Sequence, residues 1–462
     1  MHFLLFFVLS AFFLLALSWT LRTALLRSKW EYIFYFLLLY FPVYTVYLST
    51  AYASTESVFL VKGLQLLKDV LVVLAVVLFV LFQKNIFRYP WKLLPVDKIF
   101  LAFMGLAFLW MLLPLGEAGL FSKLLYFKGM LIPALIYFMG RNTNFEDNEV
   151  KQLFTIIFII GFAALGVNLI ESIINTHLQS FTGYALFNQA LNDVEPSGNF
   201  GLTWTFETQA MTKRLASFFS DPLELASSVL LAFAAGLIWF LTSKREYSSV
   251  YLLVMLCALG SLFFSSSRAA FGAFFIMIFF IALVFRLYKL ILFGLVLLLA
   301  FVVFVLFFAS EDFYYFVIDT LTFQNASSLG HVIEWLDALE SMIENPLGLG
   351  LATSGNMGSV DRELQVGGEN QFLIYGVQLG WLGMILYIAL LAKSISASLK
   401  VFHHTPNVMT ARIAFTAAAV KVGLLLPLFT ANAEMYAYVS WSSWWMVGYA
   451  MNHYPKQAAH EA

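Results

Sequence analysis

Two arginines lie beside apolar runs of the sequence, in polar segments where their side chains have chemistry to offer. Arg268 follows three serines at the junction of two such runs, and Arg214 lies in a short segment ahead of another run. A guanidinium stays charged near pH 7, and its planar fork matches the oxygens of a phosphate. Ser265, Ser267 and the first amides of the following helix would add donors for the same anion. The pattern indicates a phosphate site, and an arginine reaching the lipid headgroups is the alternative for Arg268.

A second polar group contains candidates for acid–base catalysis. Glu369 and Asn370 follow two glycines immediately before a later apolar run. A carboxylate at this place serves either as a general base or as an acid that stabilises a helix N-terminus. His331 opens a helical pattern in the preceding polar segment, where hydrogen bonding at the membrane interface is the alternative to catalysis. The segment 345–350 has the sequence Asn-Pro-Leu-Gly-Leu-Gly, which predicts a tight turn.

Metal ions and cofactors are not indicated by the sequence. It contains neither an Asp-x-Asp cluster nor a His-Glu-x-x-His pair, and Cys257 is its single cysteine. One cysteine can form neither an internal disulfide nor a thiolate metal site, so a small buried residue is its expected role. We therefore expect chemistry that uses neither a bound metal nor a cofactor.

The composition restricts where such groups can work. Of the 462 residues, 61% are hydrophobic and 11% are charged, whereas a soluble domain carries about 25% charged residues. A soluble globule of this size buries only about three quarters of its surface, so it could not hide this much apolar area. A soluble enzyme is thereby excluded. The net charge of −1 gives no reason to expect a nucleic-acid partner.

The apolar residues form runs long enough to cross a bilayer, which takes about 20 helical residues. Thirteen such runs lie near residues 2–20, 31–50, 66–83, 99–115, 125–140, 152–170, 223–241, 249–264, 269–285, 290–309, 371–392, 412–430 and 436–452. We therefore predict an all-α, polytopic integral membrane bundle of about 12–14 transmembrane helices, a single domain over residues 1–462. The first run lacks a basic leader and is followed by Arg22, Arg27 and Lys29, so we expect a retained span.

Lysine and arginine in short loops predict the orientation of the protein in the membrane, because these residues are enriched in cytoplasmic loops. If the runs alternate in direction, one side receives the basic segments 21–30, 84–98, 244–245, 286–289 and 393–412. Two long polar segments, 171–222 and 310–370, then become extracytoplasmic loops. The second contains ten acids and one base, and its apolar spacing predicts an amphipathic helix near residues 330–344 at the outer membrane face.

The order of these motifs resembles the O-antigen ligase and polymerase family of bacterial surface-polysaccharide assembly. The similarity covers roughly residues 200–392, and the first half of the chain is similar mainly in being a run of spans. It includes Arg-x-x-Ser-Phe-x-x-Asp-Pro from Arg214 and Ser-x-Ser-Arg-x-x-x-Gly around Arg268. Asn-Pro-x-Gly-x-Gly, Glu-Asn-x-x-Leu from Glu369, and Gln-Leu-Gly-Trp-Leu-Gly follow. Each motif is short, whereas their joint order is specific.

That resemblance implies a metal-independent, inverting glycosyltransferase in the bacterial inner membrane, with its active site facing the periplasm or exterior. It would transfer glycan from undecaprenyl diphosphate to a glycan acceptor, with a chain-length regulator as a further partner. On the family pattern, Arg268 and Arg214 bind the diphosphate. His331 falls where ligases tend to carry arginine, and Glu369 falls where they carry an essential histidine. The supporting residues would be Ser265, Ser267 and Asn370.

The departure at Glu369 favours a polymerase of lipid-linked oligosaccharide repeat units, with Glu369 or His331 as the base. The alternative within the family is a ligase that transfers glycan to lipid A-core or to a protein. A polytopic transporter is the alternative of another class. Transporters carry broken helices and polar groups near the membrane midplane, whereas the polar groups here gather in two outer loops. The acidity of the second loop favours a neutral or weakly charged glycan.

Overall fold

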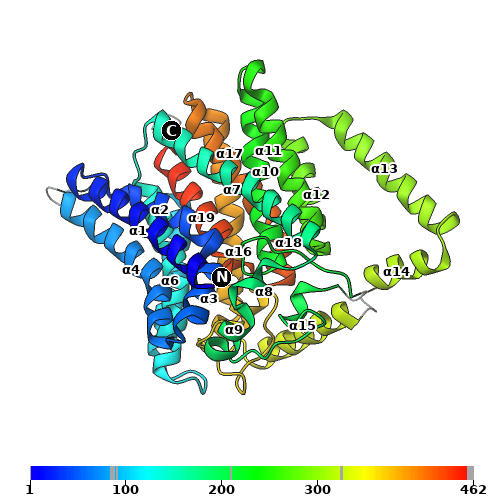
Figure 1. Cartoon of the computed structure of the whole chain (residues 1–462), viewed down its shortest axis with the longest axis horizontal. Helices are drawn as coiled ribbons and strands as arrows, with labels where there is room; N and C mark the ends of the chain where they lie inside the picture. Colours follow the sequence, from blue (N-terminus) through cyan, green and yellow to red (C-terminus); the bar gives the residue numbers. More distant parts are fainter. Residues whose placement is uncertain (1, 84–88, 90–91, 209–210, 323–325, 455–462) are drawn as a thin grey trace, which may run out of the picture.

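A computed structural model describes residues 2–83, 89, 92–208, 211–322 and 326–454 of the chain. This part is 78% helical and has no β-strand, which confirms the all-α fold predicted from the sequence. Figure 1 shows the helices gathered in one bundle, with the N-terminal helices on one flank and α13 on the other. Counting consecutive segments together, eleven described helices are long and apolar enough to cross a membrane.

The helices follow the apolar runs because a segment in hydrocarbon has to satisfy its backbone hydrogen bonds internally. The helices that match the runs are α1 (His2–Leu26), α2 (Ile33–Tyr40), α3 (Tyr44–Thr55), α4 (Val58–Phe82), α5 (Pro95–Leu112), α6 (Leu120–Asn142), α7 (Asp147–Ile174), α10 (Pro222–Thr242), α11 (Ser248–Ser265), α12 (Arg268–Val284), α13 (Tyr288–Phe307), α16 (Gln371–His404), α17 (Val408–Gly423), α18 (Leu425–Thr430) and α19 (Ala437–Asn452). Of these, α12 and α19 have only 17 and 16 residues and stand outside the eleven. Each predicted run thus coincides with one helix or with two consecutive helices.

The crossing of α6 and α19 lies at the centre of the bundle. A Cβ atom added at Gly140 would clash with the backbone of Trp445, and one added at Gly448 would clash with the backbone of Tyr137. Residues without side chains let two helix backbones approach closely in a membrane bundle. α19 is buried along nearly its whole length, and α16 and α17 also pack against it.

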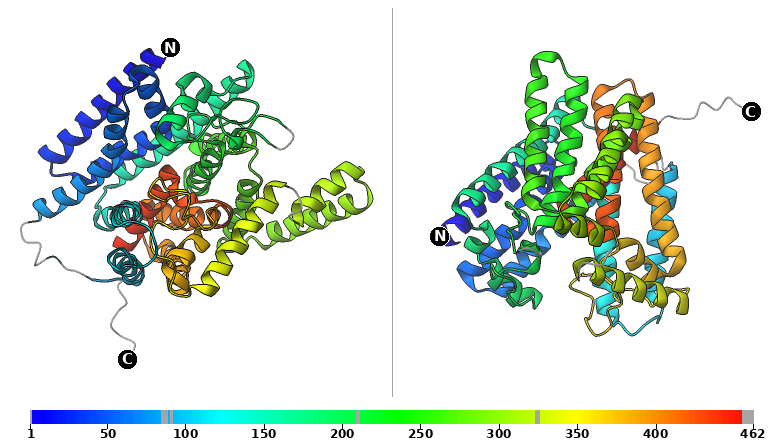
Figure 2. Two further views of the ribbon diagram at one scale, coloured as in Figure 1. Left: turned by 90° about the horizontal axis from the view of Figure 1, so that it is seen from below. Right: turned by 90° about the vertical axis from the view of Figure 1, so that its right-hand side faces the viewer.

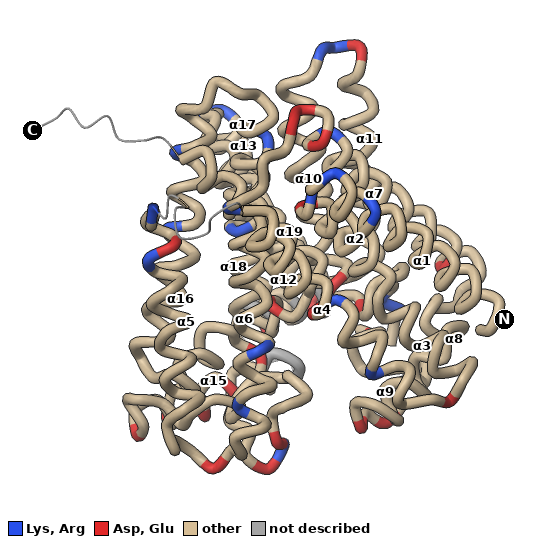
Figure 3. Tube along the Cα trace, turned by 90° about the vertical axis from the view of Figure 1, so that its left-hand side faces the viewer, with Lys and Arg blue, Asp and Glu red and all other residues tan. Residues whose placement is uncertain are grey.

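Two polar segments meet at one end of the bundle. The first contains α8 (Leu178–Thr182) and α9 (Tyr184–Asn192), and the second contains α14 (Glu311–Leu321) and α15 (Ala326–Glu344). A guanidinium nitrogen of Arg362 in the second segment donates to the carbonyl oxygen of Asp193 in the first, at 2.9 Å. We call this the α15 end. Figure 3 shows charged residues mostly at the two ends of the bundle, with acidic residues prominent around α15 and α9.

α13 stands apart from the other spans. Figures 1 and 2 show it reaching away from the bundle together with α14. Only 6% of its most apolar window is buried, and Val305 is the buried residue of this helix. A helix that is apolar all round and so little covered by protein is suited to contact with lipid.

α15 packs on α16 through one face and leaves part of its apolar stripe uncovered. Ala338 and Met342 are buried against Val377 of α16. In contrast, Leu336 and Ile343 are 59% and 69% exposed. Part of the stripe predicted from the sequence therefore faces away from the protein, where the surface of a membrane would cover it, whereas Trp335 of the same helix packs on Phe429 of α18.

α16 is broken near its start, although its sequence predicts a continuous span. Gly380 adopts φ 70°, a left-handed conformation that glycine tolerates. Two carbonyl groups on the N-terminal side of the break accept hydrogen bonds from outside the helix. The N–H of Leu349 donates to Val377 at 2.7 Å, and the N–H of Gly350 donates to Gln378 at 3.1 Å.

The segment 345–350 thus fills the break in α16. The N–H of Trp381 donates to the carbonyl oxygen of Pro346 at 3.3 Å, which completes the exchange of backbone bonds. The side chain of Gln378 donates to Tyr126 at 2.6 Å and accepts from the N–H of Ala352 at 2.8 Å. Broken helices in transporters leave backbone groups for a substrate, whereas these groups of α16 are bonded by the chain itself.

The basic segments of the sequence lie toward the end of the bundle opposite the α15 end, with one difference from the prediction. α16 continues to His404, so Lys393 and Lys400 lie in its last third and not in a loop. Lys84 and Arg88, which belong to the predicted basic segment 84–98, lie outside the described residues.

Candidate functional site

Arg214 is anchored on the end of α11. Its Nε donates to the carbonyl oxygen of Ser265 at 3.0 Å. The N–H of the next residue, Leu215, donates to the carbonyl oxygen of Phe264, also at 3.0 Å. The last carbonyl groups of a helix have no partner within it, so this contact satisfies α11 and fixes Arg214. In the described part of the chain, the two terminal amino groups of Arg214 have no hydrogen-bond partner.

Two polar side chains that sequence patterns do not single out hold the segment around Arg214. Glu171, near the end of α7, accepts from the N–H of Ser217 at 3.0 Å. Gln179 donates to the carbonyl oxygens of Ser217 and Phe219 at 2.9 Å each. Both side chains are buried. One sequence feature could have revealed Glu171: it is a carboxylate at the end of an apolar run. A charge in that position is costly unless hydrogen-bond donors pair with it.

The turn between α11 and α12 uses its serine hydroxyls on its own backbone. Ser265 Oγ donates to the carbonyl oxygen of Leu262 at 2.6 Å. Ser267 Oγ accepts from the N–H of Ala270 at 3.3 Å and so serves as the N-cap of α12. The O–H of Ser265 is thus used within the turn, whereas Ser267 uses only its oxygen there. The longest polar side chain that the turn presents is exposed Arg268.

Arg268 lies close enough to Arg214 for their charges to interact. Burial lowers the pKa of Arg214 below its ordinary value, Asp221 and Tyr436 oppose this shift, and the positive charge of Arg268 adds to it. Neither guanidinium forms an ion pair within the described residues. Two like charges held near each other favour an anion that contacts both.

An ion pair joins α15 to the residues before α16. His331 Nδ1 forms an ion pair with Glu369 Oε2 when the imidazole is protonated. This contact raises the pKa of His331 above its ordinary value; burial and the charge of Arg268 oppose the rise, and Glu334 supports it. His331 is therefore protonated over a wider pH range than a free histidine, and it lies in the field of Arg268.

The first turn of α16 shows which residue caps this helix. Asn370 Oδ1 accepts from the N–H groups of Phe372 and Leu373 at 3.0 and 3.3 Å, so Asn370 is the N-cap. Glu369 precedes the cap, and its half-buried carboxylate turns to His331. A carboxylate that is not used for capping is free to accept a proton from a bound hydroxyl.

Tyr436, which the motifs do not include, connects the two halves of the site. Burial raises its pKa well above the ordinary value, Asp221 and Glu224 add to the rise, Arg214 opposes it, and Glu369 adds again. Its ring therefore lies within electrostatic range of both Arg214 and Glu369. The described residues give its hydroxyl no hydrogen-bond partner. The available signal was its position in the short polar stretch before α19.

These five residues form what we call the charged cluster: Arg214, Arg268, His331, Glu369 and Tyr436. The cluster contains three cationic side chains and one carboxylate, which come from four separate parts of the chain. The cations can hold an anion that carries more than one charge, and the carboxylate can take up a proton.

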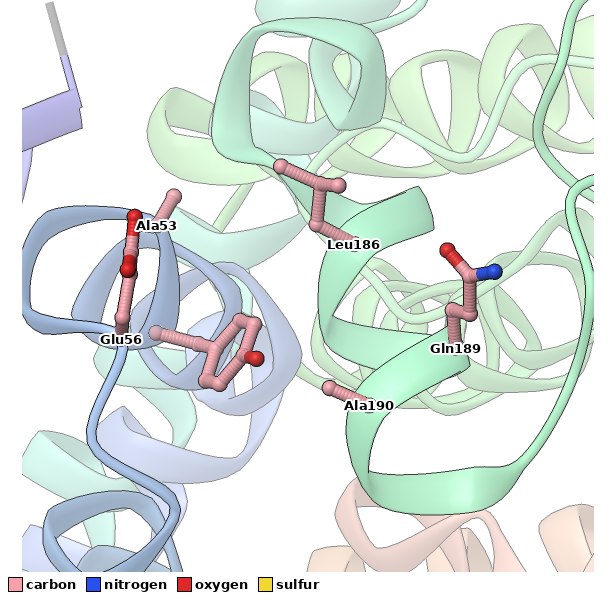
Figure 4. A pocket seen from close by; sticks show the side chains of 6 residues that line it. Ala53, Glu56, Leu186, Gln189 and Ala190 are labelled. Carbon is pink, nitrogen blue, oxygen red and sulfur yellow. The ribbon is translucent and has the colours of Figure 1, made fainter.

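The described residues outside this cluster offer less chemistry. They contain no group of three or more His, Cys, Asp or Glu that could hold a metal ion. A pocket of about 270 Å³ lies between the end of α3 and α9, as Figure 4 shows. Tyr52, Glu56, Leu186 and Gln189 line it together with two alanines, and none of the motif residues does. We therefore take the charged cluster as the candidate site.

Comparison with known protein families identifies the region around this cluster. Residues 252–388 match the family model described as O-antigen ligase. The chain carries an O-antigen ligase domain. This match confirms the family resemblance that the order of the motifs indicates. No curated protein matches the chain.

The O-antigen ligase domain extends from α11 into α16 and contains Arg268, His331 and Glu369. Arg214 and Tyr436 lie outside the matched residues and reach the same cluster from the flanking parts of the chain. The family and the eleven apolar helices together indicate a multi-pass bacterial membrane protein of polysaccharide biosynthesis. The matched family suggests an enzyme of the ligase or polymerase type and implies lipid-linked glycan as the substrate class.

Proposed function

We propose that this protein polymerises undecaprenyl diphosphate-linked oligosaccharide repeat units at the outer face of the inner membrane. The charged cluster carries the proposal, because Arg214 and Arg268 lie near each other and near the pair of His331 and Glu369. A diphosphate leaving group requires cations, and an acceptor hydroxyl requires a base. Both requirements are met within one cluster at the α15 end.

The transfer inverts the anomeric carbon of the donor. The oxygen of the acceptor hydroxyl attacks this carbon from the face opposite the diphosphate, and the bond from the carbon to the diphosphate oxygen breaks. The hydroxyl proton passes to Glu369, and the electron pair leaves with undecaprenyl diphosphate. Arg268 and Arg214 stabilise the charge that grows on the leaving oxygen, which is how preorganised cations accelerate such a step.

His331 contributes a positive charge and a fixed partner for Glu369. A histidine whose pKa is raised by a carboxylate is a poorer base at neutral pH than an ordinary one. The pairing therefore favours Glu369 as the base. His331 then adds a third cation beside the diphosphate.

The residue at position 369 supports a polymerase over a ligase, because this chain has a glutamate where the ligases that it resembles carry an essential histidine. The orientation is supported by the basic segments at the end opposite the charged cluster, which the positive-inside rule places in the cytoplasm. Because the matched family is described as O-antigen ligase, transfer to lipid A-core or to a protein is the second candidate.

Purified protein incubated with a synthetic lipid diphosphate-linked oligosaccharide tests the proposal. A polymerase releases undecaprenyl diphosphate and lengthens the glycan in steps of one repeat unit. A ligase forms product only after lipid A-core or an acceptor protein is added. In cells, deletion of a polymerase removes the ladder of surface-glycan lengths, whereas deletion of a ligase removes all attached long glycan. A normal ladder in the deletion strain would contradict the proposal.

A further inference from the structure

A second group of charges lies among the spans, outside the charged cluster. Lys68 and Asp69 belong to α4, and Lys128 belongs to α6. Lys128 Nζ donates to Asp69 Oδ2 at 2.7 Å, and Lys68 Nζ lies 3.6 Å from Asp69 Oδ1. Two ammonium groups thus share one carboxylate. We call these three residues the α4–α6 charge group.

The charges of this group do not cancel. Two lysines and one aspartate leave a net charge of +1, and the described residues give none of the three a further ion pair. Lys68 Nζ also donates to the carbonyl oxygen of Gln65 at 3.2 Å and lies 5.1 Å from the ring centroid of Tyr44, so it is held inside the bundle. An uncompensated charge among apolar spans is costly and calls for an anion from outside the chain.

The α4–α6 charge group is open to such an anion. The side chain of Lys128 is 44% exposed, whereas those of Lys68 and Asp69 are 20% and 10% exposed. A ligand can therefore contact Lys128 directly while Lys68 reinforces the local positive potential. Lys62, one to two turns nearer the start of α4, is exposed as well and adds to that potential.

The group lies toward the same end of the bundle as the charged cluster. Met357, in the segment between α15 and α16, packs on Gly129 directly beside Lys128. One turn earlier, the hydroxyl of Tyr126 accepts from Gln378 near the start of α16. The α4–α6 charge group therefore lies toward the α15 end on α4 and α6. Arg214 and Arg268 reach this end from a later part of the chain, just before α10 and at the start of α12.

We infer that the α4–α6 charge group binds the phosphate group of a second lipid, the lipid-linked acceptor of the reaction. The inference rests on the proposed function, because polymerisation of lipid-linked units brings two lipid diphosphates to the enzyme at once. Ammonium groups bind phosphate as compact point charges. The charged cluster then holds the donor, and the α4–α6 charge group holds the acceptor. Anionic phospholipids carry the same phosphate chemistry, so the experiment has to separate the two sources.

Binding without turnover provides the first test. Full-length protein in phosphatidylcholine nanodiscs is titrated with undecaprenyl diphosphate, and the bound copies are counted by native mass spectrometry. We expect two copies on the wild-type protein. Lys128→Met should weaken one of them about tenfold or more, and Arg268→Ala should weaken the other. Lys151→Met, an exposed lysine at the start of α7, is the matched control and should leave both in place. A single copy on the wild-type protein would overturn the inference.

A series of net charges separates an anion site from a structural ion pair. Asp69→Asn raises the net charge to +2, Lys128→Met lowers it to 0, and the double variant returns it to +1 without the ion pair. Affinity at the second site should rise with the net charge of the group. Lys128→Met should therefore bind most weakly, and Asp69→Asn should bind most tightly. If affinity stays constant while thermal stability falls in the single variants, the group is a structural ion pair and the inference is wrong.

Competition and kinetics identify the lipid. Excess phosphatidylglycerol should leave the second copy of undecaprenyl diphosphate bound, and its displacement would assign the group to bulk phospholipid instead. With oligosaccharide-linked substrates, Lys128→Met should raise the acceptor KM about tenfold and leave kcat and the donor KM unchanged. An unchanged acceptor KM would contradict the inference. Because the copies are counted without turnover, a wild-type protein that binds two lipids but transfers no glycan would contradict the proposed function alone.

Discussion

The imidazole of His331 and the carboxylate of Glu369 form an ion pair that joins α15 to the residue before the N-cap of α16. If Glu369 is the base, Glu369→Gln should lower the rate of glycan transfer about 10²- to 10⁴-fold, because the amide keeps the shape but cannot take up the proton. Initial rates of the purified variants measure this loss. Glu363→Gln changes an exposed acid of the same segment and serves as the control. Full turnover in Glu369→Gln would transfer the role of base to His331.

The same pair predicts a pH dependence. The pKa of His331 is raised above its unfolded value, so the positive charge and its contribution to stability are complete below the unfolded pKa and are lost as the pH rises through the folded pKa. The kcat/KM for the donor should therefore decline on the alkaline side. Glu369→Gln should move the decline in donor binding to lower pH, and His331→Arg should abolish it. Donor-binding profiles over about pH 6 to 9 measure these shifts, and an unmoved profile in His331→Arg would contradict the assignment.

Arg268 is exposed and has no ion pair in the described chain, so its removal should cost function and not stability. We expect Arg268→Ala to reduce transfer about 10²- to 10³-fold, the loss typical of one donor to a developing oxyanion. The melting temperature should stay near that of the wild-type protein, because exposed substitutions change the free energy of unfolding by about 0.5 kcal/mol or less. Arg245→Ala, at the other end of the bundle, should change neither quantity. Substantial activity in Arg268→Ala would remove this arginine from the site.

Arg214 differs from Arg268 because part of its guanidinium is used in structure. Arg214→Lys keeps a positive charge but loses the Nε contact to Ser265 and the fork that holds two oxygens. We expect about a tenfold lower transfer rate, since a hydrogen bond to a charged group is worth about 1.5–3 kcal/mol. Donor binding measured beside turnover separates the two effects. A lysine variant with wild-type kinetics would show that the fork has no role.

The break in α16 predicts a large stability effect. In Gly380→Ala, the added Cβ would clash with the carbonyl oxygen of Pro346, and the left-handed φ alone costs about 1–2 kcal/mol. We expect a loss of at least that size in thermal or denaturant unfolding. Gly166→Ala, in open space on a helical turn of α7, should be neutral or slightly stabilising. Equal stability in the two variants would contradict the strained geometry at Gly380.

The positions of the helices could be predicted from the sequence, and so could several residues of the candidate site. Apolar runs of sufficient length have few alternatives to a helix in hydrocarbon. Arg268 and Arg214 stood out for a local reason, because a charge beside an apolar run needs a partner or a use. The fold class and the family therefore followed from features that lie within single segments.

The relationships between segments could not be predicted in the same way. The pairing of His331 with Glu369 depends on how α15 lies against α16, and no periodicity encodes that angle. Tyr436 joins the candidate site only because the stretch between α18 and α19 brings it within electrostatic range of Arg214. Ser265 was expected to donate to an anion, but its O–H donates to the carbonyl oxygen of Leu262 at the end of α11; Ser267 caps α12 through its oxygen, and its role toward an anion stays a prediction.

The exchange of backbone bonds between residues 345–350 and α16 also limits how this protein can be re-engineered. The short stretch completes a helix that is synthesised after it, so neither part has a finished backbone until both have entered the bundle. A chimaera that grafts the loop of a relative onto this scaffold, in order to alter glycan choice, would have to carry residues 345 to 383 across as one cassette. A graft that stopped at the membrane boundary would break the backbone hydrogen bonds between residues 345–350 and α16. Polar peptide groups would then be left unpaired in the interior of the bundle.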